Sequence, residues 1–241
     1  MTTRREFIQA GGGLAALTLL AGCNKVTGLA ATQLPDEVGI PTTDKGLRFL
    51  DRIGYGPRPG ELDRLAKIGH QEWLNEQLAA NQPEPWQLEA KLARIDLLRM
   101  NGVELMDLPP SELERQLHQV VILRSTYSPN QLRERMADFW SNHFNLYSQK
   151  ANGAYYIASD QANVVRKHCL GSFPEMLKAS AHSPAMLEYL DNQVNRKGRV
   201  NENYAREIME LHSLGVNSGY TQRDIVEVSR CFSGWAVEKR F

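Results

Sequence analysis

Apolar residues recur at helical spacing along almost the whole of this chain. Leu47, Leu50 and Ile53 give a first short amphipathic helix that Gly54 and Gly56 close, and the pattern returns in later segments. No run of Val, Ile and Thr residues alternates with polar residues, as a half-buried strand would require. The pattern predicts an all-α fold of about ten helices.

Helix starts are marked by serines and threonines. A capping box pairs such a residue with an acidic side chain three positions later. The pattern predicts boxes at Ser111 with Glu114, at Ser172 with Glu175 and at Thr221 with Asp224. A serine before a proline predicts an N-cap followed by proline at the first helical position. Such pairs begin at Ser128 and at Ser183.

The first 22 residues have the pattern of an export signal. Arg4 and Arg5 precede one polar and two apolar residues, which is typical of the twin-arginine signature. The uncharged stretch over 7–22 is too short and too rich in glycine for a comfortable membrane span. It ends with Ala21 and Gly22 before Cys23, which suits cleavage and lipid attachment at the cysteine. A plain membrane anchor with a chance cysteine is the alternative.

This interpretation divides the chain into a signal peptide over 1–22, a flexible tether over 23–42 and a helical domain over 43–241. The twin-arginine translocase and the membrane, through lipid on Cys23, are then partners. Asn24 is not the aspartate expected for retention in the inner membrane, so we expect an envelope lipoprotein facing the periplasm, at the outer membrane. Export in the folded state favours a cofactor loaded beforehand, without identifying it.

Charge and cysteine content argue against nucleic-acid binding and against a zinc site built from cysteines. The formal net charge is zero, so no basic excess indicates nucleic-acid binding. After Cys23 only Cys169 and Cys231 remain, and no C-x-x-C pair predicts a zinc site. A disulfide between these two residues stays open.

His143 lies in an aromatic stripe. On a helix it shares one face with Met136, Phe139, Trp140, Phe144 and Tyr147. A core histidine with one bonded ring nitrogen is one interpretation. A ligand or proton carrier that faces a buried pocket is the other.

A polar loop follows Leu190. It contains Asp191, Asn192 and Asn195, and it continues through Asn201 to Asn203. Such oxygens suit calcium or magnesium, although the spacing is not that of an EF-hand. Asparagine and aspartate also cap helices and form turns, which is the alternative.

The helix that begins at Asn203 separates its charged residues from its apolar ones. Asn203, Arg206, Glu207 and Glu210 lie on one side, and His212 lies among the apolar residues on the other. Glu207 and Glu210 could pair as acid and base or bind a cation. The alternative is a solvated face with an Arg206–Glu210 ion pair. We expect Gly215 to end the helix.

Together these segments resemble the domain-of-unknown-function 1800 family of bacterial, twin-arginine-exported proteins. The resemblance rests on residues 48–57, 139–144 and 186–192, on the run N-E-N-Y-A-R-E-I-M-E-L-H-S-L-G at 201–215, and on residues 219–222 and 233–235. It implies a largely helical fold and raises the importance of the 201–215 run, without implying an activity. Family members usually continue further, so we expect the domain here to be incomplete at its C-terminus. The genes of family members often lie beside genes for sulfatase-like exported proteins, which makes such a protein an expected partner.

Two hypotheses follow. The first is a metal-assisted hydrolase of the envelope. A divalent cation would be held by Asp191, Asn192, Asn203 and Glu207, and the catalytic candidates would be His143, Glu207, Glu210 and His212. The second is a non-catalytic envelope lipoprotein that binds or assembles with an exported sulfatase-like partner. In that case the 201–215 run would be a buried polar network.

Overall fold

The computed structural model describes residues 45–150 and 152–237. Within this part every regular element is helical, and the pairing of Arg196 with Arg199 is an isolated bridge. The predicted all-α fold is therefore confirmed. The predicted export signal, Cys23 and the tether over 23–42 lie outside the described residues.

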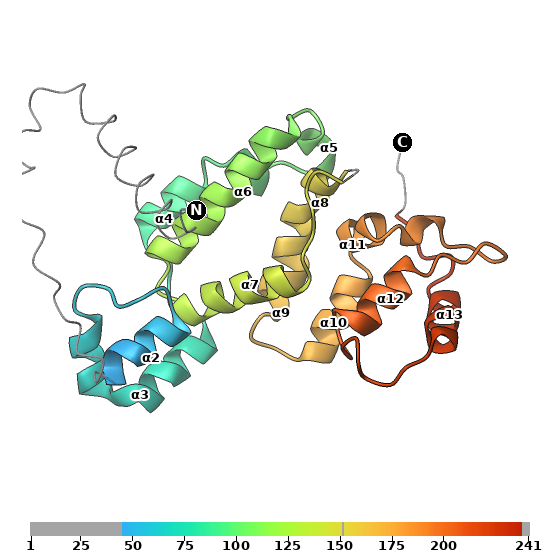
Figure 1. The fold of residues 1–241 in the computed structure, drawn as a ribbon. Helices are drawn as coiled ribbons and strands as arrows, with labels where there is room; N and C mark the ends of the chain where they lie inside the picture. The colour runs from blue at the N-terminus through green and yellow to red at the C-terminus, as the bar shows by residue number, and fades with distance from the viewer. Residues whose placement is uncertain (1–44, 151, 238–241) are drawn as a thin grey trace, which may run out of the picture. The chain divides into compact units, whose positions relative to one another are not determined.

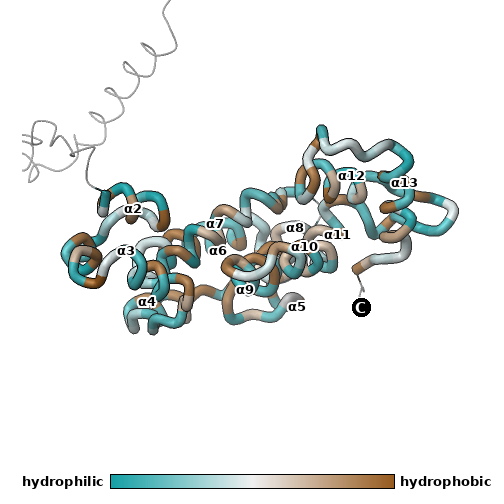
Figure 2. Tube along the Cα trace, turned by 90° about the horizontal axis from the view of Figure 1, so that it is seen from below, coloured by the Kyte–Doolittle hydropathy of each residue, from teal (hydrophilic) through white to brown (hydrophobic). Residues whose placement is uncertain are grey.

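The helices follow one another along the chain, joined by turns and, around α12 and between α7 and α8, by longer loops (Figure 1). In chain order they are α2 (Lys45–Ile53), α3 (Glu61–Ala79), α4 (Trp86–Leu92), η1 (Asp96–Leu98), α5 (Gly102–Leu105), α6 (Pro110–Tyr127), α7 (Gln131–His143), α8 (Gly153–Asp160), η2 (Gln161–Val165), α9 (Arg166–His168), α10 (Phe173–Ala181), α11 (Pro184–Tyr189), η3 (Asn192–Val194), α12 (Asn203–Glu210) and α13 (Gln222–Cys231). Teal and brown alternate along the tube in Figure 2, as expected of helices with one buried face.

The first two helices bury a small core of their own. Leu50 of α2 packs with Leu65 and Trp73 of α3, and all three side chains are buried. Gly69 has a φ of 81° and interrupts α3, so the helix can keep both Leu65 and Trp73 on the buried side. Pro83 and Pro85 then separate α3 from α4, as the sequence predicts.

Two predicted helix starts are wrong, for different reasons. Pro110 occupies the first position of α6, so Ser111 lies inside the first turn and cannot cap it. Glu114 instead accepts hydrogen bonds from two side chains of the segment after α7. The helix predicted from Ser128 begins later, at Gln131. The Ser128 hydroxyl is used elsewhere, because it donates to the Glu84 carboxylate.

The later starts agree better with the sequence. Ser183 is the N-cap of α11, with Pro184 in the first turn. Both halves of the box at Thr221 are formed. Ser172 is the N-cap of α10, but its side chain makes no capping bond and Glu175 pairs with Lys178 instead. The predicted box there is therefore wrong although the boundary is right.

The rod formed by α8, η2 and α9 separates two parts of the core. On one side α8 packs with α6 and the segment before it, around Leu97, Leu113 and Val120. On the other side α10 packs with η2 and α9, and α11 packs with α8, around Met186 and Tyr204. The η2 segment is a π-helical turn, which places one extra residue in the rod. The rod, α6 and α7 are the elements that position the candidate site.

Candidate functional site

The polar loop after α11 uses its asparagines to fasten the chain to α13. Asn192 is 1% exposed, and its amide donates to the carbonyl oxygens of Phe232 at 3.2 Å and Trp235 at 3.0 Å. Asn195 is equally buried. Its amide donates to the Ser229 carbonyl at 2.8 Å and its oxygen accepts from the Asn201 backbone at 3.0 Å. These amides replace backbone pairing that an irregular loop lacks.

The four side chains predicted to hold a cation do not converge. Asp191 turns toward Lys150, and its carboxylate lies 2.8 Å from the ammonium group. Asn192 and Asn203 donate their amide hydrogens to backbone carbonyls, Asn203 to that of Leu190 at 3.2 Å. Glu207 makes no side-chain hydrogen bond or ion pair in the described part of the chain. A donor set that is used in this way does not fit a metal ion.

A wider search gives the same result. Among the residues that the structure describes, no group of three or more His, Cys, Asp or Glu side chains could hold a metal ion. Cys169, which is buried, and Cys231, which is exposed, are free thiols. The geometry therefore does not support a metal centre built from the described residues.

The charged face of α12 matches the solvated-face interpretation. The predicted pair of Arg206 with Glu210 is present at 3.4 Å. Arg206 also contacts the carboxylate of Glu202 at 3.2 Å and the side-chain oxygen of Gln222 at 2.9 Å. The helix ends at Glu210, before the predicted Gly215, and the Gly215 backbone still donates to the carbonyl of Met209. Glu210 is thus engaged with its own helix.

The two histidines lie together in an aromatic core. His143 ends α7, and its Nε2 lies 3.0 Å from the backbone oxygen of His212. Phe144 packs edge-on against the His143 ring at 4.8 Å. His212 is 5% exposed, and burial, followed by the nearby His143, lowers the pKa of His212 to about 4. This geometry favours the interpretation of His143 as a packed core histidine.

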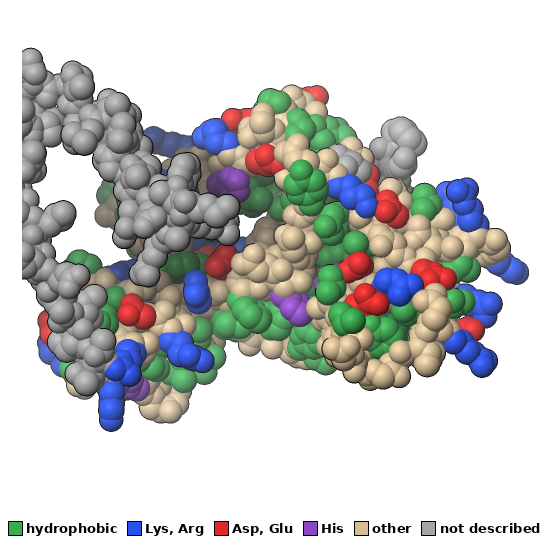
Figure 3. All heavy atoms as spheres, viewed as in Figure 1, with side chains coloured by type: hydrophobic (Ala, Val, Ile, Leu, Met, Phe, Trp, Pro, Cys, Tyr) green, Lys and Arg blue, Asp and Glu red, His purple; other side chains and the backbone are tan. Residues whose placement is uncertain are grey.

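A large cavity lies elsewhere, between α6, α7 and the rod of α8 and η2. Its volume is about 760 Å³, within the range of small-molecule sites. Figure 3 shows a hollow in the place that Figure 1 gives to the space between α6, α7 and α8. None of the proposed catalytic residues His143, Glu207, Glu210 and His212 lines this cavity. The catalytic residues predicted from the sequence and the cavity therefore lie in different parts of the molecule.

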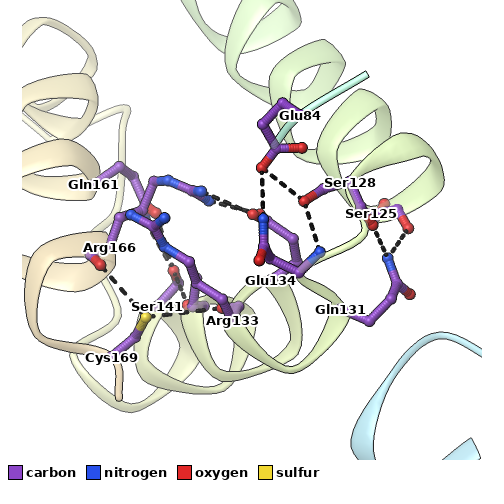
Figure 4. A network of polar contacts seen from close by, with 12 residues as sticks. Glu84, Ser125, Ser128, Gln131, Arg133, Glu134, Ser141, Gln161, Arg166 and Cys169 are labelled. Carbon is purple, nitrogen blue, oxygen red and sulfur yellow. Dashed lines mark hydrogen bonds and ion pairs between the residues drawn. The ribbon is translucent and has the colours of Figure 1, made fainter. Parts of the chain in front are cut away.

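A buried ion pair forms one wall of the cavity (Figure 4). Arg166 of α9 donates to both oxygens of Glu134 of α7, at 2.6 and 2.8 Å. The Glu134 side chain is only 6% exposed. Ser141 and Gln161 exchange hydrogen bonds beside the pair, at 2.8 and 3.2 Å. Because Gln161 begins the π-helical turn, the turn contributes directly to the polar wall.

Asp160 adds a titratable carboxyl to the cavity lining. Its side chain accepts a hydrogen bond from the Ser183 hydroxyl at 2.5 Å, and the residue is 5% exposed. Burial raises the pKa of Asp160 to about 6, and the bond from Ser183 lowers it only in part. A carboxyl with a pKa near neutrality in a cavity is a common property of functional sites.

Sequence reasoning missed Glu134, Asp160 and Arg166 because each is a single charged residue in a helical segment without a recognisable motif. Glu134, Ala137 and Ser141 do share one face at helical spacing, and that face lines the cavity. A charged residue on an otherwise buried face was the available signal. The π-helical turn at 161–165 has no comparable signature in the sequence.

Comparison with known proteins gives one match. Residues 48–240 match the family model DUF1800, described as a protein of unknown function. No curated protein and no solved structure matches the chain.

Proposed function

We propose a function for this chain as a member of the DUF1800 family, to which it belongs. It is a lipid-anchored protein of the cell envelope, and its helical domain binds a small molecule in the cavity between α6, α7 and the α8–η2 rod. The observation that carries the binding function is the cavity of about 760 Å³ with both apolar and charged walls. Such a lining can hold a ligand and also fix its orientation.

The binding function is preferred to metal-assisted hydrolysis because of where the polar groups lie. The predicted metal ligands and acid–base residues bond to their own chain or lie outside the cavity. The cavity, in contrast, has a buried ion pair and a buried carboxyl in its walls. Binding of a small molecule therefore needs only the residues that line the cavity, whereas metal-assisted hydrolysis would need groups that lie elsewhere.

A blocking substitution tests the binding function. Ala162 is exposed and lines the cavity, whereas Ala90 is exposed on α4 and does not. We would titrate the neutral fluorescent dye Nile red into the full chain carrying Cys23→Ser, which cannot receive lipid. We expect Ala162→Trp to weaken dye binding at least fivefold and Ala90→Trp to leave it unchanged. Equal binding by both variants would count against the cavity as a binding site.

The envelope location is supported by the paired Arg4 and Arg5 and by the small residues before Cys23. Across the described residues, no helix has the length and apolar character that a membrane crossing requires. Lipid on Cys23 would then be the attachment, facing the periplasm at the outer membrane.

Labelling tests this attachment. We would express the chain in a bacterial host with a clickable palmitate analogue and separate soluble from membrane fractions. We expect Cys23→Ser to abolish labelling. The double substitution Arg4→Lys and Arg5→Lys should keep the chain unprocessed in the cytoplasm. Labelled, membrane-bound Cys23→Ser protein would contradict lipid attachment at this residue.

A second, compatible proposal is assembly with an exported sulfatase-like partner. The segment after α12 favours it, because Leu211, Leu214 and Val216 are 59%, 57% and 63% exposed there. Exposed apolar side chains that lie close together often mark a protein interface. Co-expression with an exported sulfatase-like protein encoded beside a family member should give a complex by gel filtration. Leu211→Glu with Val216→Glu should abolish that complex, and an unchanged complex would exclude this surface.

A further inference from the structure

The charged side chains around the cavity are unevenly paired. The four acidic side chains that line it each have a polar partner: Glu134 with Arg166, Glu114 with Ser148 and Gln149, Asp138 with Arg135, and Asp160 with Ser183. The arginines differ. Arg166 is occupied by Glu134, but Arg124 and Arg133 also line the cavity. Neither of their guanidinium groups makes a hydrogen bond or ion pair within the described residues.

Arg124 is the more constrained of the two. Its Nε is shielded from solvent and has no hydrogen-bond partner in the described part of the chain. Burial, and next the charge of Arg166, lower the pKa of Arg124. Glu134 and Glu84 attract the guanidinium from a distance without forming an ion pair with it. A guanidinium keeps its charge in proteins, so this charge stays without a direct ion-pair partner among the described residues beside the cavity.

Arg133 adds a second free guanidinium from the facing helix. Arg124 belongs to α6 and Arg133 to α7, the two long helices that bound the cavity. The two charges are close enough to repel, since Arg133 also lowers the pKa of Arg124. Two guanidinium groups that line one cavity without an ion-pair partner fit a shared oxyanion, because each can donate two parallel hydrogen bonds to it.

The remaining walls are largely apolar. Leu117 and Val120 of α6 and Ile157 of α8 line the cavity, with Val165 at the end of the π-helical turn. These side chains offer no hydrogen bonds and favour hydrocarbon over a polar group. The cavity therefore combines one region of unpaired positive charge with an apolar region.

We propose that this cavity binds an anionic amphiphile, with its carboxylate or comparable oxyanion between Arg124 and Arg133 and its hydrocarbon chain against Leu117, Val120 and Ile157. This inference rests on the proposed binding function and names the class of ligand. Glu134 occupies Arg166, which leaves the other two arginines available to the ligand.

Three probes with the same chain length and different heads test the ligand class. We would measure binding of decanoate, decanol and decyltrimethylammonium to the full Cys23→Ser chain by calorimetry, below the concentrations at which the probes aggregate. We expect decanoate to bind at least tenfold more tightly than decanol, and decyltrimethylammonium to bind least. Arg124→Gln and Arg133→Gln should each weaken decanoate binding about tenfold and leave decanol binding unchanged.

Matched variants separate recognition from folding and from net charge. Arg223 is exposed on α13 and outside the cavity, so Arg223→Gln removes the same charge and should bind decanoate like the parent. Arg124→Lys should retain part of the affinity, and the unfolding midpoint of each variant shows whether it is folded. If Arg124→Gln is unfolded, the decanoate affinity of Arg133→Gln alone tests whether the arginines bind the carboxylate.

The possible results distinguish the two proposals. Equal affinity for decanoate and decanol, both lost in Ala162→Trp, would overturn the anionic ligand class and keep the binding function. Tight decanoate binding that neither glutamine variant weakens would also overturn the inference. No binding of any probe, with Nile red binding unaffected by Ala162→Trp, would remove the inference and the binding function together.

Discussion

The asparagine loop after α11 and the cavity beside α7 are both rich in polar groups, yet they use them differently. In the loop, Asn192 and Asn195 are buried and direct their amides to their own chain. Around the cavity, Arg124 and Arg133 have no such partner among the described residues. Dense polar sequence therefore serves packing in the first region, whereas unpaired charge is the feature on which the proposed binding rests in the second.

The backbone explains this difference. The segment over 191–202 contains only the short η3 turn and the isolated bridge of Arg196 with Arg199, so many of its other peptide groups need side chains as hydrogen-bond partners. The helices around the cavity satisfy their own backbone groups, which leaves their side chains available. A polar run in an irregular segment is thus weaker evidence for a site than one charged residue on a buried helix face.

The buried pair of Glu134 and Arg166 should give the largest effect on stability. Glu134→Ala would leave Arg166 buried without its partner, which costs about 3–5 kcal/mol of the free energy of unfolding. Glu175→Ala removes an exposed partner of Lys178 and should cost less than about 1 kcal/mol. Urea unfolding at neutral pH measures both variants.

A double variant makes this test specific. Glu134→Leu with Arg166→Met replaces the pair by apolar groups of similar size and should lose less stability than Glu134→Ala. A loss in Glu134→Ala no larger than that in Glu175→Ala would mean that the cavity wall does not depend on the pair.

Asp160 should make stability depend on pH with an unusual sign. Its pKa is about 6 in the folded chain, against an ordinary value of 3.8, so the folded state holds this proton more tightly than the unfolded state. The stabilisation is complete below pH 3.8 and is lost as pH rises through 6, by about 3 kcal/mol for a shift of about two units. Relative to the parent, Asp160→Asn should therefore gain about that much stability between pH 4 and pH 7.

His212 makes the comparison with the parent necessary. Its pKa is lowered to about 4 from 6.5, so its contribution has the opposite sign and is lost as pH falls through this window. The two titrations offset each other in the parent chain. Urea unfolding of parent and Asp160→Asn at four pH values between 4 and 7 isolates the Asp160 contribution. Parallel pH profiles would show that its pKa is not raised.

Asn195 provides the corresponding test in the loop. Asn195→Ala removes the partners of the Asn201 N–H and the Ser229 carbonyl, which should cost about 2–3 kcal/mol of the free energy of unfolding. Asn163→Ala, at an exposed position on η2, should cost little. We expect Asn195→Ala to bind Nile red like the parent where it is folded. Weakened dye binding in a folded variant would connect the loop to the cavity and break the contrast between the regions.

The sequence predicted the helical class well because helical periodicity and capping are local properties. The Thr221 box and the start at Ser183 followed from neighbours within one turn. The failures at Ser111 and Ser128 arose where a nearby proline or a distant carboxylate competed for the same group. Local rules cannot include such competition.

The candidate site was less predictable because it depends on distant contacts. Glu134 and Arg166 are 32 residues apart, and Ser183 reaches Asp160 across 23 residues. Nothing in either local sequence requires these pairs. The Arg206–Glu210 pair, in contrast, was correctly predicted because both residues lie on one helix.

The Arg206–Glu210 pair should give the smallest effect on the free energy of unfolding. The Arg206 side chain is 36% exposed and pairs with Glu202 at the N-cap of α12 and with Glu210 at its end. Each exposed pair of this spacing contributes about 0.3–0.5 kcal/mol, so Arg206→Ala should cost less than about 1 kcal/mol by urea unfolding. Raising the salt concentration should reduce the cost further, since exposed pairs are screened. Decanoate binding should stay the same, because Arg206 is outside the cavity.

A loss of stability in Arg206→Ala as large as that in Glu134→Ala would mean that the charged face of α12 is buried against a partner in the functional protein. The polar residues of the 201–215 run would then serve recognition rather than packing.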